Sequence, residues 1–535
     1  MTLKRIVLSV LTLLVAWVMS QSLISSFSEP QVGNQLQLYQ TDLIVQASEW
    51  DGSGLPETEI QQFRNAVFGK DAIETANEQY QEVRKDAATS LTRVQQQIET
   101  VTATDTERKQ SLTKTAQSQQ ILIDQIDLRL GMVHIQQNEV DKALNTWEAL
   151  ASRPSRQAQA AAVLADLWKT PPVIGPQTQA TVESQLKGWF RYKALDRLYT
   201  LENKAEQNEQ LTIKERQFAE QTLIQLSIVG LLPSLGGLLG SALLIALIGQ
   251  RLLRGNAALL AIEEEKWQVP WNWEVVWLVI VGGFLFTGQL ALPLILQVGL
   301  LVTQSATLQP AAGMLSNSLA SMGSDAATGL ASAGFTSTGF ILGLTNRGKA
   351  LYSLVFYLLM AASTLGVLYW AIKEYLPLSK EWFQIKLAGR WPLWGFGGYF
   401  VALPLMLAVS LLNQQIWQGQ GGNNPILQIV LEERDPIALG MFLFTAAIAA
   451  PVFEEVLFRG FLLPSLTRYM STWGAIGLSS LIFSVAHLSF SEVLPLTVLG
   501  AILGFVYAKT QNLMASILLH STWNSITMIG LFLLG

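Results

Sequence analysis

The most informative stretch of this chain is residues 446–460, which read AAIAAPVFEEVLFRG. Two adjacent carboxylates, Glu454 and Glu455, follow one apolar run and precede another. Inserting a charged side chain at the centre of a bilayer costs about 2.5–3.5 kcal/mol of free energy, even on the insertion scale that gives the lowest values. Such groups are therefore rarely present without a function. Glu455 and Arg459 are four positions apart and can pair on one helix face, whereas Glu454 lies about 100° around the helix without that partner. Glu454 is therefore a candidate general base.

The composition of the whole chain is that of a membrane protein. Of its 535 residues, 50% are hydrophobic and only 14% are charged, which is too apolar for one soluble domain of this length. The complete lack of cysteine excludes disulfides, thiolate metal sites and a cysteine nucleophile. A formal charge of −5 without a long basic run argues against a nucleic-acid partner.

Nine apolar segments have the length expected of membrane helices. They run over residues 6–24, 223–249, 275–303, 350–372, 392–413, 437–462, 473–490, 492–508 and 513–534. The first follows Lys4 and Arg5 and suits a signal peptide or a membrane helix; since no clear A-x-A cleavage site follows, we favour an uncleaved anchor. The Ser/Ala/Gly-rich loop 304–349 is polar or partly re-enters the membrane, and its residues do not decide between the two.

Residues 29–222 are rich in Gln, Glu and Lys at helical spacing, which predicts a water-facing helical domain. Within it, Leu130-Gly131, Asn138, Ala143-Leu144 and Trp147 resemble one tetratricopeptide-type hairpin. An ordinary helical hairpin is the favoured interpretation, because a repeat array needs several units to form its binding groove. If Lys4 and Arg5 are cytoplasmic, the basic loops place this domain on the non-cytoplasmic side, where a protein partner is a hypothesis for its role.

The sequence thus predicts an all-α, polytopic membrane helix bundle of about eight or nine transmembrane helices with an N-terminal extramembrane domain. We expect it in the lipid bilayer of a prokaryotic or organellar membrane. Its predicted segments are an anchor (1–28), the helical domain (29–222), additional membrane helices (223–374) and a C-terminal core (375–535).

Two of the three histidines lie in the same apolar third as the glutamates. His487 ends the segment Phe483-Ser-Val-Ala-His487, where Phe483 is one turn earlier and is expected to pack against it. His520 and Asn524 are four positions apart, so an imidazole and an amide share one helix face, an arrangement suited to stabilising an oxyanion or fixing a water. At a rise of 1.5 Å per residue, Glu454, His487 and Asn524 lie roughly 12–21 Å from the predicted cytoplasmic end of their helices. The three side chains can therefore meet at a similar depth in the membrane.

These three motifs, in this order, resemble the signatures of the CPBP family, which comprises the CAAX proteases and the bacteriocin-processing, Abi-type peptidases. The matching residues are Glu454-Glu455-x-x-x-Arg459, Phe483-x-x-x-His487 and His520-x-x-x-Asn524. The resemblance covers about residues 375–535. It implies an intramembrane endopeptidase that hydrolyses a peptide bond of a membrane-associated protein or peptide.

The resemblance also implies a role for each residue. Glu454 and His487 would activate a water, while His520 and Asn524 would stabilise the oxyanion. Glu455 and Arg459 would support the site by orienting it and balancing its charge.

Other functions fit some of these residues. Glu454, His487 and His520 could ligate zinc with an open position for water, although no HExxH motif is present; no cofactor is expected, and zinc stays open. Chains of intramembrane Glu and His also serve as proton relays in transporters. A catalytically silent membrane scaffold is a further alternative. The order of the motifs favours the peptidase.

Overall fold

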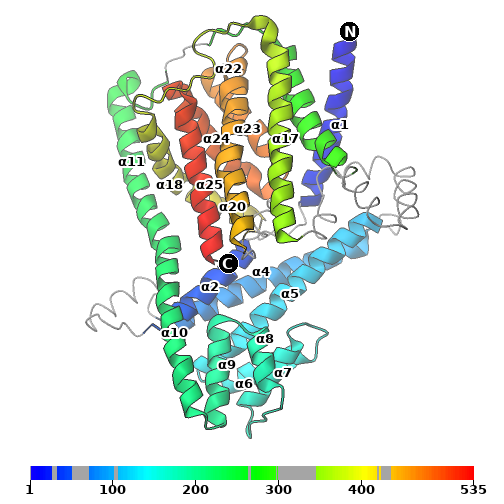
Figure 1. Ribbon diagram of the computed structural model, residues 1–535, viewed down its shortest axis with the longest axis vertical. Coiled ribbons are helices and arrows are strands. Elements are labelled where there is room, and N and C mark those ends of the chain that lie inside the picture. The colour runs from blue at the N-terminus through cyan, green and yellow to red at the C-terminus, as the bar shows by residue number, and fades with distance from the viewer. Residues whose placement is uncertain are drawn as a thin grey trace. The chain divides into compact units, whose positions relative to one another are not determined.

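The computed structural model describes residues 2–26, 33–50, 71–101, 106–262, 267–296, 298, 345–417, 421–422, 430 and 435–534. Every regular element in these ranges is a helix, which confirms the predicted all-α class (Figure 1). The loop 304–349, which the sequence predicted to be either polar or partly re-entrant, lies almost entirely outside the described residues.

Eight helices in the described ranges are long and apolar enough to cross a membrane. They are Leu3–Ile24, Ala205–Ala257, Trp273–Leu296, Asn346–Tyr375, Trp391–Trp417, Pro436–Leu466, Phe490–Thr510 and Leu513–Leu534. The prediction of a polytopic membrane helix bundle is therefore confirmed.

The chain forms two compact units, the first comprising Met1–Phe27, Leu235–Trp417 and Gly421–Phe532. Its elements, of which η3, η5 and η6 are π-helical, are α1 (Leu3–Ser26), α11 (Leu232–Arg254), η2 (Gly255–Ala257), α12 (Trp273–Trp277), η3 (Leu278–Ala291), α17 (Asn346–Ile372), η4 (Lys373–Tyr375), α18 (Trp391–Trp417), α20 (Pro436–Phe444), η5 (Thr445–Ala449), α21 (Ala450–Glu454), η6 (Glu455–Leu462), α22 (Leu463–Leu466), α23 (Thr472–Val485), α24 (Phe490–Thr510) and α25 (Leu513–Leu534).

The segment from α20 to α22 is one continuous helix with two π-helical stretches. It begins at the N-cap Asp435, whose carboxylate accepts a hydrogen bond from the N–H of Ile437, and Pro436 occupies the first turn, where its missing N–H costs nothing. Pro451 and Pro464 follow the π-helical stretches η5 and η6. Because proline cannot donate the i→i−4 hydrogen bond of an α-helix, the backbone widens before each of them.

The membrane helix predicted over residues 473–490 ends earlier in the structure than the sequence predicted. Helix α23 stops at Val485, and the chain turns through Leu488, which has a left-handed φ of 59°, before α24 begins at Phe490. Hydropathy does not resolve this turn, because it is short and lies directly between two apolar helices. His487 therefore lies on a turn and not within a helix.

Small residues bring α24 against α23. A Cβ atom on Gly500 would lie 3.0 Å from Cβ of Ser480, and one on Gly504 would lie 3.2 Å from side-chain atoms of Ile476 and Leu463. The two helices therefore approach closely enough for backbone groups of α24 to reach polar side chains of the neighbouring elements.

The second unit comprises Ser28–Ser234 together with Gln418–Gln420 and Leu533–Gly535. Its elements are α2 (Gly33–Ala47), α4 (Ala72–Thr100), α5 (Thr106–Gln136), α6 (Val140–Ala151), α7 (Ala158–Trp168), α8 (Thr178–Gln185), α9 (Gly188–Leu201), α10 (Ala205–Leu226) and the π-helical η1 (Ser227–Leu231). The predicted hairpin corresponds to α5 and α6, joined by a turn at Asn138 with φ 61°. Trp147 packs directly on Gly131 and donates a hydrogen bond to the carbonyl of Leu128 over 3.1 Å, so this unit has its own core.

Candidate active site within the membrane helices

Glu455 and Arg459 form a fully buried ion pair at the start of η6. Their side chains are 0% and 1% exposed, and Nη1 of Arg459 lies 2.9 Å from Oε1 of Glu455. Nη2 of Arg459 donates to the carbonyl of Gly500 on α24 over 2.9 Å, and the guanidinium lies 4.8 Å from the centre of the Phe483 ring. The predicted pairing of Glu455 with Arg459 is confirmed, and the arginine charge is compensated from three directions.

His520 on α25 lies between the two adjacent glutamates. Its Nδ1 is 3.0 Å from Oε1 of Glu455, and its Nε2 is 3.8 Å from Oε2 of Glu454. A carboxylate paired with arginine can only accept a hydrogen bond, so Nδ1 of His520 carries a hydrogen and Nε2 is directed toward Glu454. The sequence predicted the proximity of His520 to the site but not its hydrogen bond to Glu455.

The other oxygen of Glu454 accepts a hydrogen bond from α17. The hydroxyl of Tyr357 donates to Oε1 of Glu454 over 2.7 Å. Sequence reasoning missed this residue, because α17 lies outside the predicted core 375–535. The available signal was a tyrosine within an apolar segment, since a buried hydroxyl needs a hydrogen-bond partner.

His487 is held by its own turn. Its Nδ1 lies 2.9 Å from the carbonyl oxygen of Phe483, so Nδ1 carries the hydrogen and Nε2 is the basic atom. The Phe483 ring packs against His487 at 5.0 Å and against His520 at 5.9 Å, so both histidines border one aromatic side chain. The contacts described for His487 do not include a hydrogen bond to Glu454.

Asn524 contacts the helix that leads to Glu454. Its Nδ2 donates to the carbonyl of Ala446 over 2.7 Å, within the π-helical stretch η5. One amide hydrogen is used in this contact, which leaves the second for another acceptor. Helix α20 contacts α17 on one side, and the η5 stretch that follows it contacts α25 (Figure 1).

The three side chains considered as zinc ligands are not gathered into a metal site. Across the part of the chain that the structure describes, no group of three or more His, Asp and Glu side chains is arranged to hold a metal ion. We therefore derive no catalytic step through a metal.

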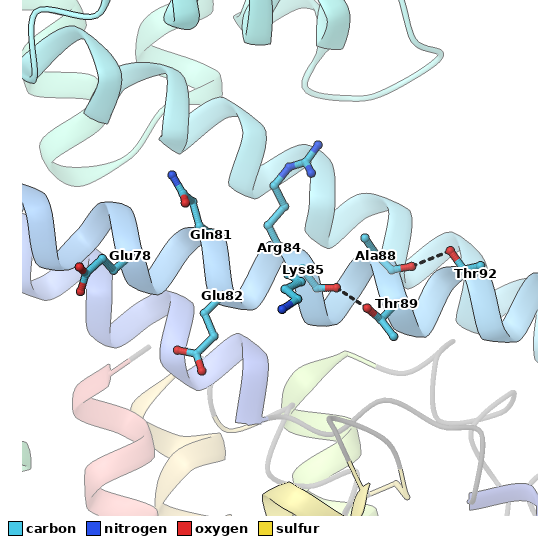
Figure 2. A pocket seen from close by; sticks show the side chains of 8 residues that line it. All are labelled: Glu78, Gln81, Glu82, Arg84, Lys85, Ala88, Thr89 and Thr92. Carbon is cyan, nitrogen blue, oxygen red and sulfur yellow. Dashed lines mark hydrogen bonds between the residues drawn. The ribbon is translucent and has the colours of Figure 1, made fainter.

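A broad hollow of about 870 Å³ lies elsewhere, in the second unit (Figure 2). The described residues that line it all belong to α4, and they are Glu78, Gln81, Glu82, Arg84, Lys85, Ala88, Thr89 and Thr92. Side chains from one helix do not enclose a ligand, so this hollow is not a second candidate for the active site.

Residues 436–526 match the family model described as "Type II CAAX prenyl endopeptidase Rce1-like". All seven site residues predicted from the sequence lie in this range, whereas Tyr357 lies outside it.

Curated relatives carry similar descriptions. The chain is 26% identical to the "Putative membrane peptidase YdiL" of Bacillus subtilis (strain 168) over 137 residues, which are 26% of this chain and 55% of the relative. It is 27% identical to the "Membrane-embedded CAAX protease MroQ" of Staphylococcus aureus (strain USA300) over 195 residues, or 35% of this chain and 76% of the relative. It is also 34% identical to the "UPF0177 protein YxdF" of Lactococcus lactis over 82 residues, or 15% of this chain and 45% of the relative.

The chain thus spans about half the length of YdiL and about three quarters of MroQ. No solved structure matches it significantly.

Proposed function

We propose that this chain is an intramembrane endopeptidase that hydrolyses a peptide bond of a membrane-associated protein or peptide, since residues 436–526 match the Rce1-like CAAX endopeptidase family model. The observation that carries the proposal is the position of His520 between Glu454 and the Glu455–Arg459 ion pair. Glu454, a carboxylate without a fixed countercharge, therefore lies beside the imidazole of His520. Both residues lie in the segment that matches a protease family model.

The proposed reaction uses water as the nucleophile. Glu454 accepts a proton from a water molecule, assisted by Nε2 of His487, and the water oxygen bonds to the scissile carbonyl carbon. Asn524 and the Nε2–H of His520 stabilise the negative charge that develops on the carbonyl oxygen. The C–N bond then breaks, and Glu454 returns the proton to the leaving amine, so that atoms and charges balance.

The proposed roles require a hydrogen on both nitrogens of His520. The Nδ1–H is bonded to Glu455, and an Nε2–H would face the oxyanion.

The experiment is peptide cleavage in proteoliposomes, followed by mass spectrometry of the products. The panel contains a farnesylated peptide ending in a CAAX sequence, the same peptide without the lipid, and single-span membrane peptides. We expect the wild type to cut at least one of them and the Glu454→Gln variant to lose more than about 10²-fold in rate. Glu374→Gln is the matched control, because Glu374 on η4 is an exposed carboxylate outside the site.

Three outcomes would contradict parts of the proposal. Cleavage that survives Glu454→Gln overturns the assignment of the base. Sensitivity to a chelator that zinc reverses moves the reaction to the metal-dependent alternative. A wild type that cuts nothing in the panel favours the silent scaffold.

We also propose that residues 29–222 face the non-cytoplasmic side and bind a protein client. A separate compact unit with its own core supports a function distinct from that of the membrane helices. Deletion of residues 29–222 should weaken client cleavage in membranes while leaving the cleavage of short peptides intact. Unchanged client cleavage would contradict this role.

A further inference from the structure

The helix α17 brings one polar side chain to the candidate active site. The ring of Tyr357 packs edge-on against Phe453 at 6.0 Å, and its hydroxyl donates to Oε1 of Glu454 over 2.7 Å. The neighbouring Val355, Leu358 and Leu359 are exposed on the outer surface of this unit. The tyrosine therefore faces inward on a helix whose other side is apolar and outward-facing.

This hydrogen bond sets the orientation of the Glu454 carboxylate. The terminal torsion of a glutamate is broad, so without a partner its two oxygens exchange positions easily. With Oε1 bound to Tyr357, Oε2 is the oxygen that faces Nε2 of His520 at 3.8 Å. The tyrosine thus selects which oxygen is directed toward the imidazole.

The element η3, which packs against α17, contacts the turn that carries His487. Nε2 of Gln289 on η3 donates to the carbonyl of Ala486 over 3.2 Å, next to His487 on its turn. The elements η3 and α17 pack closely, since a Cβ on Gly288 would lie 2.8 Å from Cγ of Met360. Both elements lie outside the segment that matches the family model, residues 436–526.

We propose that Tyr357 is a positioning residue for Glu454, so that α17, a helix outside the family domain, completes the active site. This inference rests on the peptidase function proposed above. It assigns to the additional membrane helices a part in the reaction beyond anchoring the chain.

The test compares Tyr357→Phe with the wild type in the proteoliposome assay, using whichever panel peptide the wild type cuts. Loss of a hydrogen bond to a charged group should lower kcat about 10- to 100-fold, with KM changed less than about threefold. The matched control is Tyr507→Phe, because Tyr507 is also buried but, within the described part of the chain, its hydroxyl has no hydrogen-bond partner.

The pH dependence of kcat separates positioning from packing. The titratable groups that face Glu454 are Tyr357 on α17 and His520 on α25, and the Glu455–Arg459 pair follows it on η6. A hydrogen bond donated to a carboxylate favours its charged form, so its removal should move the acid limb of the profile to higher pH. Difluorotyrosine at position 357 keeps the hydroxyl as a stronger donor and should move the same limb to lower pH, which tests the inference even if the Phe variant folds poorly.

The outcomes distinguish this inference from the function on which it rests. If both substitutions at 357 leave kcat and the acid limb unchanged while Glu454→Gln is inactive, the positioning role is wrong and the peptidase proposal stands. If Glu454→Gln remains active, the proposed function itself fails.

Discussion

The imidazole of His520 on α25 is hydrogen-bonded to Glu455 at the start of η6, with 3.0 Å between Nδ1 and Oε1. Both side chains are buried, and the same Glu455 oxygen also binds Arg459. The histidine is therefore oriented by a charged pair on another helix.

Removal of one member of the ion pair should destabilise the protein. Arg459→Met leaves Glu455 buried without its main countercharge, which costs about 3–5 kcal/mol in buried pairs. The double variant Glu455→Gln/Arg459→Met should recover most of this loss, because the buried charge at position 455 is removed together with that of its partner. Thermal unfolding in detergent measures both, and a double variant less stable than Arg459→Met would contradict the prediction.

The same double variant should remain inactive. Replacing the Glu455 carboxylate with an amide keeps an acceptor for Nδ1 of His520 but replaces a charge-assisted hydrogen bond with a weaker neutral one, so the imidazole is held less firmly. We expect peptide cleavage to fall at least about 10²-fold, as when an oxyanion donor is lost. Activity restored together with stability would show that Glu455 serves the fold alone.

Asn524→Ala should lower kcat and leave KM nearly unchanged. An amide that stabilises only the developing oxyanion contributes to the transition state and not to substrate binding, so we expect a loss of about 10²–10³-fold in kcat. Steady-state kinetics in proteoliposomes measure the two constants separately. A change confined to KM would instead assign Asn524 to substrate binding or to its contact with Ala446.

Gly500→Leu should disturb the site through helix packing. A side chain there meets Ser480 on α23 and displaces the carbonyl that binds Arg459, and such overpacking costs about 1–3 kcal/mol. Gly477→Leu on α23 is the control, because a Cβ at 477 meets no neighbour within 4 Å. Equal effects of the two variants on unfolding and cleavage would contradict this account.

The orientation in the membrane can be tested by cysteine labelling, since the chain has no native cysteine. Thr89 on α4 and Ser379, between η4 and α18, are both exposed. In right-side-out vesicles, a membrane-impermeant maleimide should label Thr89→Cys and should reach Ser379→Cys only after permeabilisation. The reverse pattern would place the helical unit in the cytoplasm.

Local spacing along a helix was sufficient to predict several features. The apolar segments predicted the membrane helices, and the four-residue interval predicted the Glu455–Arg459 pair, because both depend on residues close together in one chain segment. The helical spacing alone could not place His487, since the turn after α23, with its left-handed residue Leu488, has no special sequence signature.

The amino-acid sequence by itself determined that this chain is a helical membrane protein with a motif set of one protease family, because hydropathy and short intervals are properties of contiguous residues. Only the tertiary structure decided which groups face one another across helices. The rotation and register of α17, α21 and α25 bring Tyr357 to Glu454 and His520 to Glu455, although 97 and 65 residues separate these pairs along the chain. Such contacts depend on how complete helices pack, which no local pattern specifies.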